Sequence, residues 1–525
     1  MANQDEIKKP ESKLAMEKEQ KSTTRTAGIL LPVSSLPSKY GIGSFGEVAR
    51  KWVDFLYDAK QSYWQILPLS PTGFGDSPYQ SFSAFAGNPY FIELDELRDE
   101  GLLEETDYNG IRWYKSKNCA DYAALYQYRG KVLQKAFSRF NDTNALDGFI
   151  SQNQWLEDYG LYMVIKESQG NKSWVEWEEP LRTRQPDVIE KIKSGKSEEI
   201  RYHAFVQYKF YSQWKALKDY SNKKGIQIIG DIPIYVSMDS ADVWANPELY
   251  QLDENNIPKE VSGCPPDSFA AGGQLWGNPL YDWDKMSENG YLWWIERLRK
   301  SFELYDVVRL DHFRGLESYF AIPYGDKTAK RGVWKQGPGK GFIDAIKAAL
   351  KDAKIIAEDL GYLTDEVYEL LKYSGYPGMK LIQYAFDDRE AGDYLPHNYE
   401  VNTVVYPGTH DNDTLKGWVK TAPESCVSDA LLYTGVCCRR KLPDAMIRLV
   451  LQSSSSLAVI PVQDWLGLGS KARINTPSTV GGKNWCWRMN EKNINNILAK
   501  RIAETTSLFG RAKSPERSGN INETD

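Results

Sequence analysis

The stretch VVRLDHFRG at residues 307–315 has three companions along the chain: GDIPIYV at 230–236, IIAEDLG at 355–361 and VVYPGTHDND at 404–413. Each contains an apolar run rich in Val and Ile that is too short for an independent helix, which favours a buried strand. Each also carries an acid, in turn Asp311, Asp231, Glu358 and Asp411. Acids at the carboxyl ends of successive parallel strands are typical of (β/α)8 barrels, whose strand-to-helix loops meet at one catalytic face.

Eight apolar segments in all are strand candidates, the number that a closed barrel needs. They are GILLPVSSL (28–36), YWQILPLSP (63–71), IQIIGDIPIYV (226–236), YDVVRLDHF (305–313), AKIIAEDL (353–360), MKLIQYAF (379–386), TVVYPGTH (403–410) and SLAVIPVQDWL (456–466). Amphipathic helix patterns lie between several of them, for example at 47–60, 291–305 and 341–353. This alternation predicts an α/β fold, a (β/α)8 TIM barrel.

Two intervals between strand candidates are too long for one crossover helix. The first, about 95–225, is rich in helix formers and Trp, and it predicts a helical subdomain inserted between strands 2 and 3. The second, about 237–290, contains SGCPPDSFAAGGQLWGNPLYDW (262–283), whose Pro and Gly predict a long irregular loop at the active-site rim. The polar ends, 1–25 and 512–525, are expected to be disordered tails around a single catalytic barrel at 26–511.

Composition narrows the choice of partner and compartment. With 65 basic and 71 acidic residues the net charge is −6, so neither nucleic acid nor an anionic membrane is an expected partner. The aromatic content of 13% suits stacking on the apolar faces of sugar rings, although much of it must serve packing. The six cysteines form no CxxC pair, and neither a signal peptide nor a membrane-spanning run is present, so we expect a soluble, cytoplasmic protein.

The best-defined pair of candidate catalytic groups is Arg309 and Asp311. Side chains at i and i+2 of a strand share a face, so both should point into the barrel. The guanidinium would favour an ionised Asp311, ready to attack or to stabilise positive charge. An ordinary buried ion pair is the alternative for this segment alone.

Glu358 ends the next strand candidate after an apolar approach, which should raise its pKa as an acid/base group requires. Neighbouring strands lie about 4.8 Å apart, so the carboxyl groups of Asp311 and Glu358 can approach the roughly 5–5.5 Å separation of retaining glycosidases. A double displacement through a covalent sugar ester follows as a hypothesis. Asp359 should face the other way and serve structure.

His410 and Asp411 follow the seventh strand, where they could bond adjacent ring hydroxyls and hold a sugar distorted towards its transition state. A metal site at THDND is the rival interpretation, weakened by the presence of only four His in the chain. GIGSFG at 41–46 matches a dinucleotide-binding pattern, but Pro37–Tyr40 separate it from the strand and no acid ends the next strand. A tight strand-to-helix turn is the expected use of these glycines.

Taken together, these segments resemble the 4-α-glucanotransferases of the amylomaltase or disproportionating-enzyme type, glycoside hydrolase family 77, relatives of the α-amylases. The resemblance spans about 28–500 and includes SPYQSFSAFAGNPYFI (77–92), GDIPIYV, PPDSFAAGGQLWGNPLYDW, RLDHFRG, IIAEDLG, YPGMKLIQYAF (376–386), PGTHDNDT (407–414) and NWCWR (484–488). It implies that Asp311 is the nucleophile, Glu358 the general acid/base and Asp411 the transition-state stabiliser.

The resemblance also implies a substrate-binding set. Asp231, Arg309, His312 and His410 would complete the sugar subsite at the cleaved bond, Tyr79 would be a donor-side aromatic platform, and Asp267, Phe269, Trp276 and Asn278 would shape the acceptor side. Family members often carry a second aromatic residue beside that Phe, where this chain has Ser268.

By this resemblance the protein transfers a segment of α-1,4-glucan to the 4-hydroxyl of another glucan or of glucose, without metal or organic cofactor. A rim loop that binds the acceptor sugar and excludes water would favour transfer. Two alternatives remain at this stage: an α-glucan hydrolase with the same acids, and a glucan-binding protein without catalytic activity.

Overall fold

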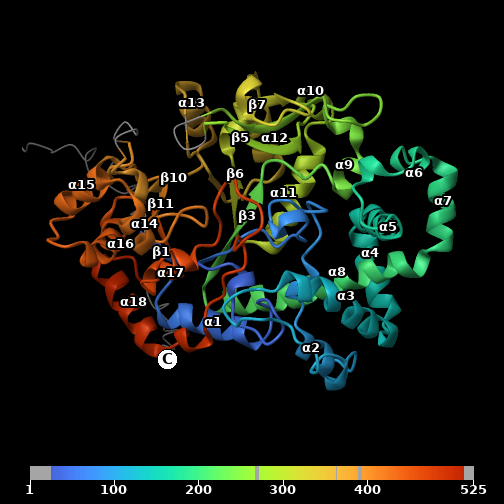
Figure 1. Cartoon of the computed structure of the whole chain (residues 1–525), viewed down its shortest axis with the longest axis horizontal. Coiled ribbons are helices and arrows are strands. Elements are labelled where there is room, and N and C mark those ends of the chain that lie inside the picture. Colours follow the sequence, from blue (N-terminus) through green and yellow to red (C-terminus); the bar gives the residue numbers. More distant parts are fainter. Residues whose placement is uncertain (1–24, 267–270, 362, 388–392, 514–525) are drawn as a thin grey trace, which may run out of the picture.

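The computed structural model describes residues 25–266, 271–361, 363–387 and 393–513. Its centre is a parallel sheet of eight strands in the order β10-β11-β12-β1-β2-β3-β6-β9 (Figure 1). The first and last strands of this order meet, because the backbone N–H of Ala357 in β9 donates to Pro377, just before β10, at 2.9 Å. The sheet is therefore a closed barrel, and the predicted (β/α)8 fold is confirmed.

All eight strand candidates contribute one barrel strand each. The strands are β1 (Thr26–Leu30), β2 (Tyr63–Gln65), β3 (Gln227–Pro233), β6 (Val307–Asp311), β9 (Ile355–Ala357), β10 (Gly378–Leu381), β11 (Thr403–Tyr406) and β12 (Leu457–Pro461). They are shorter than predicted, mainly at their carboxyl ends. Pro32, Pro68 and Pro407 lie just beyond three of these ends, and proline cannot donate to a ladder of hydrogen bonds.

Helices from successive crossovers pack around the barrel (Figure 1). They are α1 (Glu47–Asp58), the end of α8 (Ser197–Lys223), α11 (Leu292–Leu304), α12 (Gly339–Ala349), α13 (Asp365–Ser374), α16 (Leu442–Gln452) and α18 (Asn496–Leu508). Shorter helices are α9 (Ala241–Ala245), α10 (Trp283–Glu288), α14 (Leu415–Thr421), α15 (Glu424–Thr434) and α17 (Val462–Trp465). The glycines of GIGSFG form the turn into α1, where a Cβ on Gly43 would lie 1.8 Å from the Val33 carbonyl.

A lobe of helices stands beside the barrel between β2 and β3, to the right in Figure 1. Its helices are α2 (Leu94–Asp99), α3 (Tyr122–Arg139), α4 (Thr143–Gln152), α5 (Trp155–Ser168), α6 (Glu179–Arg182), α7 (Pro186–Gly195) and the first part of α8. The last part of α8 returns to the barrel, where Trp214 donates its indole N–H to the Leu304 carbonyl at 2.8 Å. One helix thus joins the lobe to the helical layer of the barrel.

The expectation that 262–283 would be irregular is wrong. Two strands, β4 (Glu260–Cys264) and β5 (Gln274–Pro279), occupy this segment, and the residues between them include 267–270, which lie outside the described part. They join β7 (Ser318–Pro323) and β8 (Val333–Gln336) in an antiparallel sheet of order β5-β4-β7-β8. Gly273 and Gly277 supply positive φ angles of 68° and 78° to the β4–β5 region, so the glycines shape a sheet here.

The described ends of the chain are bonded into the fold. Arg25 donates to the Ser453 carbonyl at 3.0 Å, and the N–H of Lys513 donates to the Lys60 carbonyl at 3.0 Å. Both residues therefore belong with the barrel, slightly beyond the predicted limits of 26 and 511. The rest of the predicted tails, 1–24 and 514–525, lies outside the described residues.

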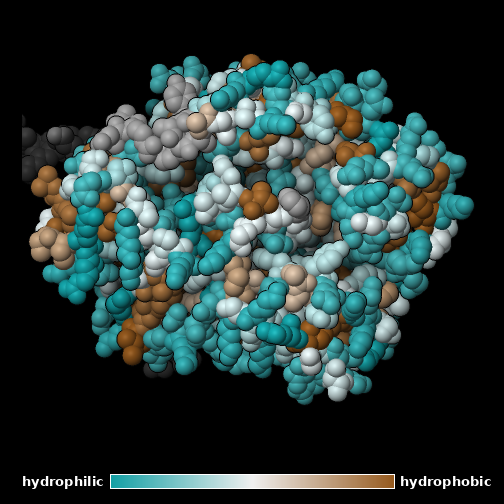
Figure 2. Space-filling view, in the orientation of Figure 1, coloured by the Kyte–Doolittle hydropathy of each residue, from teal (hydrophilic) through white to brown (hydrophobic). Residues whose placement is uncertain are grey.

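The face of the molecule in Figure 2 is mostly hydrophilic, with hydrophobic residues in small patches. One patch lies over α18, where Ile497 and Leu508 are exposed. Among the described residues, no helix is both long and apolar enough to cross a membrane.

Candidate active site

A single buried guanidinium joins two of the predicted acids at the carboxyl end of the barrel. Asp231 on β3 lies opposite Arg309 on the adjacent β6, and Nη1 of Arg309 contacts both carboxylate oxygens of Asp231 at 2.7 and 2.8 Å. The same nitrogen lies 2.8 Å from Oδ1 of Asp311. The prediction that Arg309 and Asp311 point to the same side of β6 is confirmed. Burial disfavours the charged guanidinium, but Asp231 and Asp311 together hold the pKa of Arg309 well above its usual value.

Glu358 follows β9, the next strand around the barrel after β6. Its Oε2 accepts the backbone N–H of His312 at 2.7 Å, and its Oε1 accepts that of Leu360 at 3.0 Å. The carboxyl group therefore lies beside the residue that follows Asp311. Burial is the main reason that the pKa of Glu358 is raised to about 8, with the charge of Asp311 as the second cause. The predicted rise in pKa is confirmed.

The two groups also differ in exposure. The side chain of Asp311 is 29% exposed, whereas Glu358 is only 9% exposed. An accessible carboxyl group paired with a cation and an enclosed carboxyl group with a raised pKa thus end two adjacent strands. Asp359, on the other side of the chain, accepts the N–H of Met379 at 2.6 Å and fastens β9 to β10, as predicted for a structural residue.

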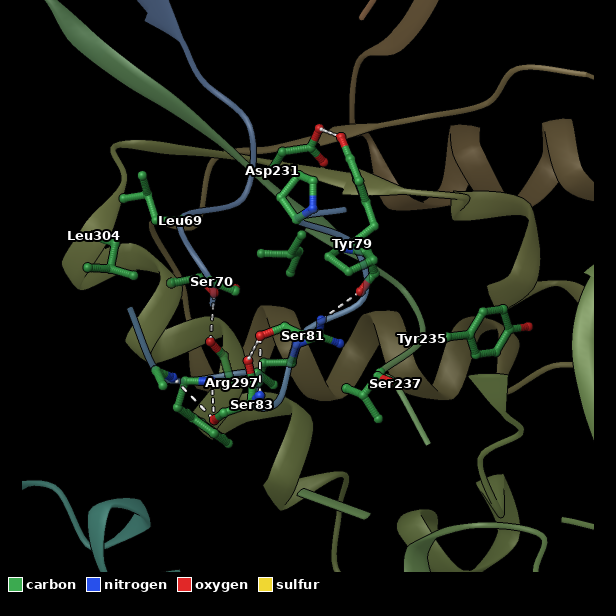
Figure 3. Close-up of a pocket in the computed structure, with 18 of the residues that line it drawn as sticks. Leu69, Ser70, Tyr79, Ser81, Ser83, Asp231, Tyr235, Ser237, Arg297 and Leu304 are labelled. Atoms are coloured by element: carbon green, nitrogen blue, oxygen red, sulfur yellow. Dashed lines mark hydrogen bonds between the residues drawn. The ribbon is translucent and has the colours of Figure 1, made fainter. Parts of the chain in front are cut away.

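Tyr79 and His410 form a stacked pair over the opposite part of the site, with ring centroids 5.3 Å apart and ring planes inclined by 13°. The Tyr79 hydroxyl donates to Oδ2 of Asp231 at 2.9 Å (Figure 3). Because Asp231 also binds Arg309, the aromatic ring is held beside this ion pair. Asp411 follows His410, with its Oδ2 at 3.5 Å from Nε2 of the imidazole. The sequence-predicted acids and aromatic residues therefore meet in one place.

A small cavity lies behind the Tyr79–Asp231 bond (Figure 3). Ser81, Ser83 and Arg297 are among its lining residues. Its volume of about 30 Å³ has room for roughly two water molecules. A glucose ring does not fit in it.

The acceptor-side residues have different surroundings. The Trp276 ring on β5 meets the His312 ring edge-on at 4.8 Å, and Trp276 is half-buried. His312 is half-buried, and desolvation of its ring lowers its pKa to about 4; its Nε2 has no hydrogen-bond partner among the described residues. The side chain of Asn278 is hydrogen-bonded within the protein: its amide N–H donates to the Val236 carbonyl at 2.7 Å, and its amide oxygen accepts from Gln80 at 3.2 Å. Asp267 and Phe269, with Ser268 between them, lie outside the described residues.

The arrangement provides the groups that a retaining glycosidic reaction needs: a carboxylate, a carboxylic acid on the neighbouring strand, and aromatic rings for a sugar. Residues 31–494 match the sequence profile of the glycoside hydrolase family 77, described as 4-alpha-glucanotransferase. The chain belongs to this family.

Relatives within the 4-alpha-glucanotransferase family cover almost all of the chain. A 4-alpha-glucanotransferase from Clostridium butyricum is 47% identical over 92% of this chain and all of its own length, and one from Thermus thermophilus is 45% identical over 89% and 95%. The solved amylomaltase from Streptococcus agalactiae in complex with acarbose is 40% identical, with a TM-score of 0.90 over 93% of this chain and all of its own. These likenesses support the transferase interpretation over the hydrolase alternative.

Sequence reasoning missed three residues that complete the site. Trp485 lies against both Tyr79 and His410, with ring centroids 5.7 and 5.9 Å away. Asn475 donates its amide N–H to Oδ1 of Asp411 at 2.7 Å, and Arg473 donates to the Asp411 carbonyl at 2.5 Å. Trp485 could have been predicted, because it belongs to the segment NWCWR that carries the family resemblance. Asn475 and Arg473 have no local sequence signal and are identified by their contacts.

Proposed function

We propose that the protein transfers α-1,4-glucan segments between malto-oligosaccharides, with glucose as the smallest acceptor, by a retaining double displacement. The observation that supports it most strongly is the pairing of Asp311, held by Arg309, with a Glu358 whose pKa is raised to about 8. A carboxyl group held by a cation, next to an enclosed carboxyl group with a raised pKa, suits a nucleophile and a general acid/base.

In the first half-reaction Asp311 attacks the anomeric carbon while Glu358 gives its proton to the departing 4-oxygen. A glycosyl ester forms on Asp311, and the bond to the leaving sugar breaks. In the second half-reaction Glu358, now ionised, takes the proton of an acceptor 4-hydroxyl, which attacks the same carbon and releases Asp311. Asp411, with His410, would bind ring hydroxyls and stabilise the positive charge of the two transition states.

The substrate would be held by rings at two sides of this centre. Tyr79, stacked on His410, would form the donor-side surface, and Trp276, edge-on to His312, the acceptor-side surface. Asp231 would serve through Arg309 and Tyr79, both of which it binds. Asp267, Phe269 and Asn278 remain proposed members of the acceptor side, and a cytoplasmic location remains part of the proposal.

Incubation with maltotriose tests the proposal. A transferase yields glucose and longer oligomers while the number of reducing ends stays constant, whereas a steady rise in reducing ends would indicate a hydrolase. A glucan-binding protein would form no product at all. Asp311→Asn should lower the rate by roughly 10⁴-fold or more and leave maltotriose binding, measured by calorimetry, largely intact.

A further inference from the structure

We infer that Asn475 is a positioning residue for Asp411, holding one oxygen of that carboxylate so that the other faces the sugar; this inference rests on the proposed function. Asp411 needs such a support, because it lies in the loop after β11 and its side chain is 45% exposed. An exposed carboxylate without a partner samples several rotamers, and misplacement of a catalytic group by about 1 Å can cost 10²-fold in rate.

The two oxygens of Asp411 have different surroundings. Oδ1 accepts the amide N–H of Asn475 at 2.7 Å. Oδ2 lies 3.5 Å from Nε2 of His410, longer than an ordinary hydrogen bond, and is therefore free to accept from a ligand. The bond to Asn475 thus fixes the carboxylate plane and leaves one oxygen for substrate.

A neutral donor fits the electrostatic task of Asp411. A Lys or Arg in the same place would pair the carboxylate and reduce its attraction for an oxocarbenium-like transition state. The amide of Asn475 donates a hydrogen bond without adding charge. The nearby cation, Arg473, donates to the main-chain carbonyl of Asp411 at 2.5 Å, so no hydrogen bond from it occupies the carboxylate.

The backbone around Asn475 is fastened independently of its side chain. The N–H of Asn475 donates to the His410 carbonyl at 3.1 Å, and Nε of Arg473 donates to the Asn475 carbonyl at 2.6 Å. Further along the same loop, Trp485 donates its backbone N–H to the Ile474 carbonyl at 2.7 Å. Replacing the Asn475 side chain should therefore leave the loop in place and release only the carboxylate.

Asn475→Asp separates positioning from a general structural role. Above the pKa of the new acid, two carboxylates face each other and Asp411 is pushed away, so kcat should fall by roughly 10- to 100-fold. At lower pH the new side chain is protonated and donates a hydrogen bond again. The charged and titratable groups that face this pair are His410, Arg473 and Tyr79, and they are the same in the variant and the wild type.

The experiment compares maltotriose transfer by the wild type, Asn475→Asp and Asn475→Ala between pH 4.5 and 8. The matched control is Asn484→Asp in the same loop, because the Asn484 side chain bonds to Thr476 and Thr479 and, among the described residues, to no acid. The ratio of Asn475→Asp to wild-type kcat should rise about tenfold as the pH falls, with KM little changed. Asn475→Ala should be slow at every pH, and Asn484→Asp should follow the wild type.

Two results would contradict the inference: a ratio that does not change with pH, or an effect of Asn475→Asp and Asn475→Ala on KM alone, which would make Asn475 a sugar-binding residue. The wild type distinguishes the underlying proposal. If it transfers no glucan from maltotriose, the proposed function fails; if it does and the ratio stays flat, only the positioning role fails. Circular dichroism of each variant checks that it is folded.

Discussion

Replacement of Glu358 by Gln should remove the proton donor while retaining the shape of the side chain. The size of the effect follows from the pKa of about 8. At pH 6.5 such a group is about 97% protonated, whereas a glutamic acid with the usual pKa of 4.5 would be about 1% protonated. The raised pKa thus increases the fraction of enzyme with a protonated Glu358 about a hundredfold. Loss of the acid should lower kcat/KM for maltotriose by roughly 10²- to 10⁴-fold.

A glycosyl donor whose leaving group needs no proton makes this prediction specific. Fluoride leaves without a proton, so Glu358→Gln should form the glycosyl ester from α-maltotriosyl fluoride at close to the wild-type rate. Azide needs no general base and should restore turnover by attacking that ester, giving an α-glycosyl azide. Product analysis by liquid chromatography and NMR measures both effects.

The pH profile supplies the second readout. The wild type should lose kcat/KM for maltotriose above about pH 8, as free Glu358 loses its proton, and the variant should lack this limb. If Glu358→Gln slows ester formation from the fluoride as much as it slows the reaction of maltotriose, or if azide has no effect, Glu358 is not the acid/base and the assignment of roles is wrong.

Three further predictions concern stability and binding. The folded-state pKa of Glu358 is above the usual 4.5, so loss of its proton destabilises the folded protein, and its contribution to the free energy of unfolding should fall by on the order of 4 kcal/mol from pH 4.5 to 8. In urea unfolding, the stability of Glu358→Gln relative to the wild type should therefore increase as the pH rises. Parallel curves of stability against pH would refute this. Trp276→Ala should raise KM for maltotriose about tenfold with Trp276→Phe near the wild type, and an unchanged KM would remove Trp276 from the substrate surface. Arg511 is fully buried and donates to the carbonyls of Leu451, Ser453 and Ser455, so Arg511→Ala should cost about 3 kcal/mol in urea unfolding, against almost nothing for the exposed Lys500→Ala.

The barrel could be predicted because its strands are local features of the sequence. The apolar run of VVRLD needs no distant partner to be recognised, and the acids that end such runs must lie on one face of any parallel barrel. The raised pKa of Glu358 was predictable for the same reason. Arg309 stands two residues from Asp311, whereas only apolar residues precede Glu358.

The rim sheet could not be predicted in this way. Residues 262–283 are rich in Gly and Pro, which locally indicate an irregular loop. Their strand structure depends on β7, which lies after the barrel strand β6 and pairs with β4 from Glu260 to Gly263. The partner that makes this segment a strand lies far along the chain, so the local Gly and Pro content does not indicate it.

The residues that contact the acids could not be predicted for the same reason: their partners lie far away along the chain. Asp411 and Asn475 are 64 residues apart, and Tyr79 and His410 come from opposite ends of the chain. A lone Asn in the segment RINTP carries no signal of its role, because an amide side chain is common in any loop. The candidate acids were visible in the sequence, whereas the residues that bond to them required the folded structure.

The central claim is that Asp311 carries the sugar between the two half-reactions. Glu358→Gln mixed with α-maltotriosyl fluoride should accumulate the glycosyl ester, because its formation needs no acid and its breakdown lacks the base. Mass spectrometry of the denatured, protease-digested protein should then find a maltotriosyl group on the peptide containing VVRLDHF, at Asp311. A label on Asp231 or Asp411, or turnover of the fluoride by the variant with no label on the protein, would contradict the account.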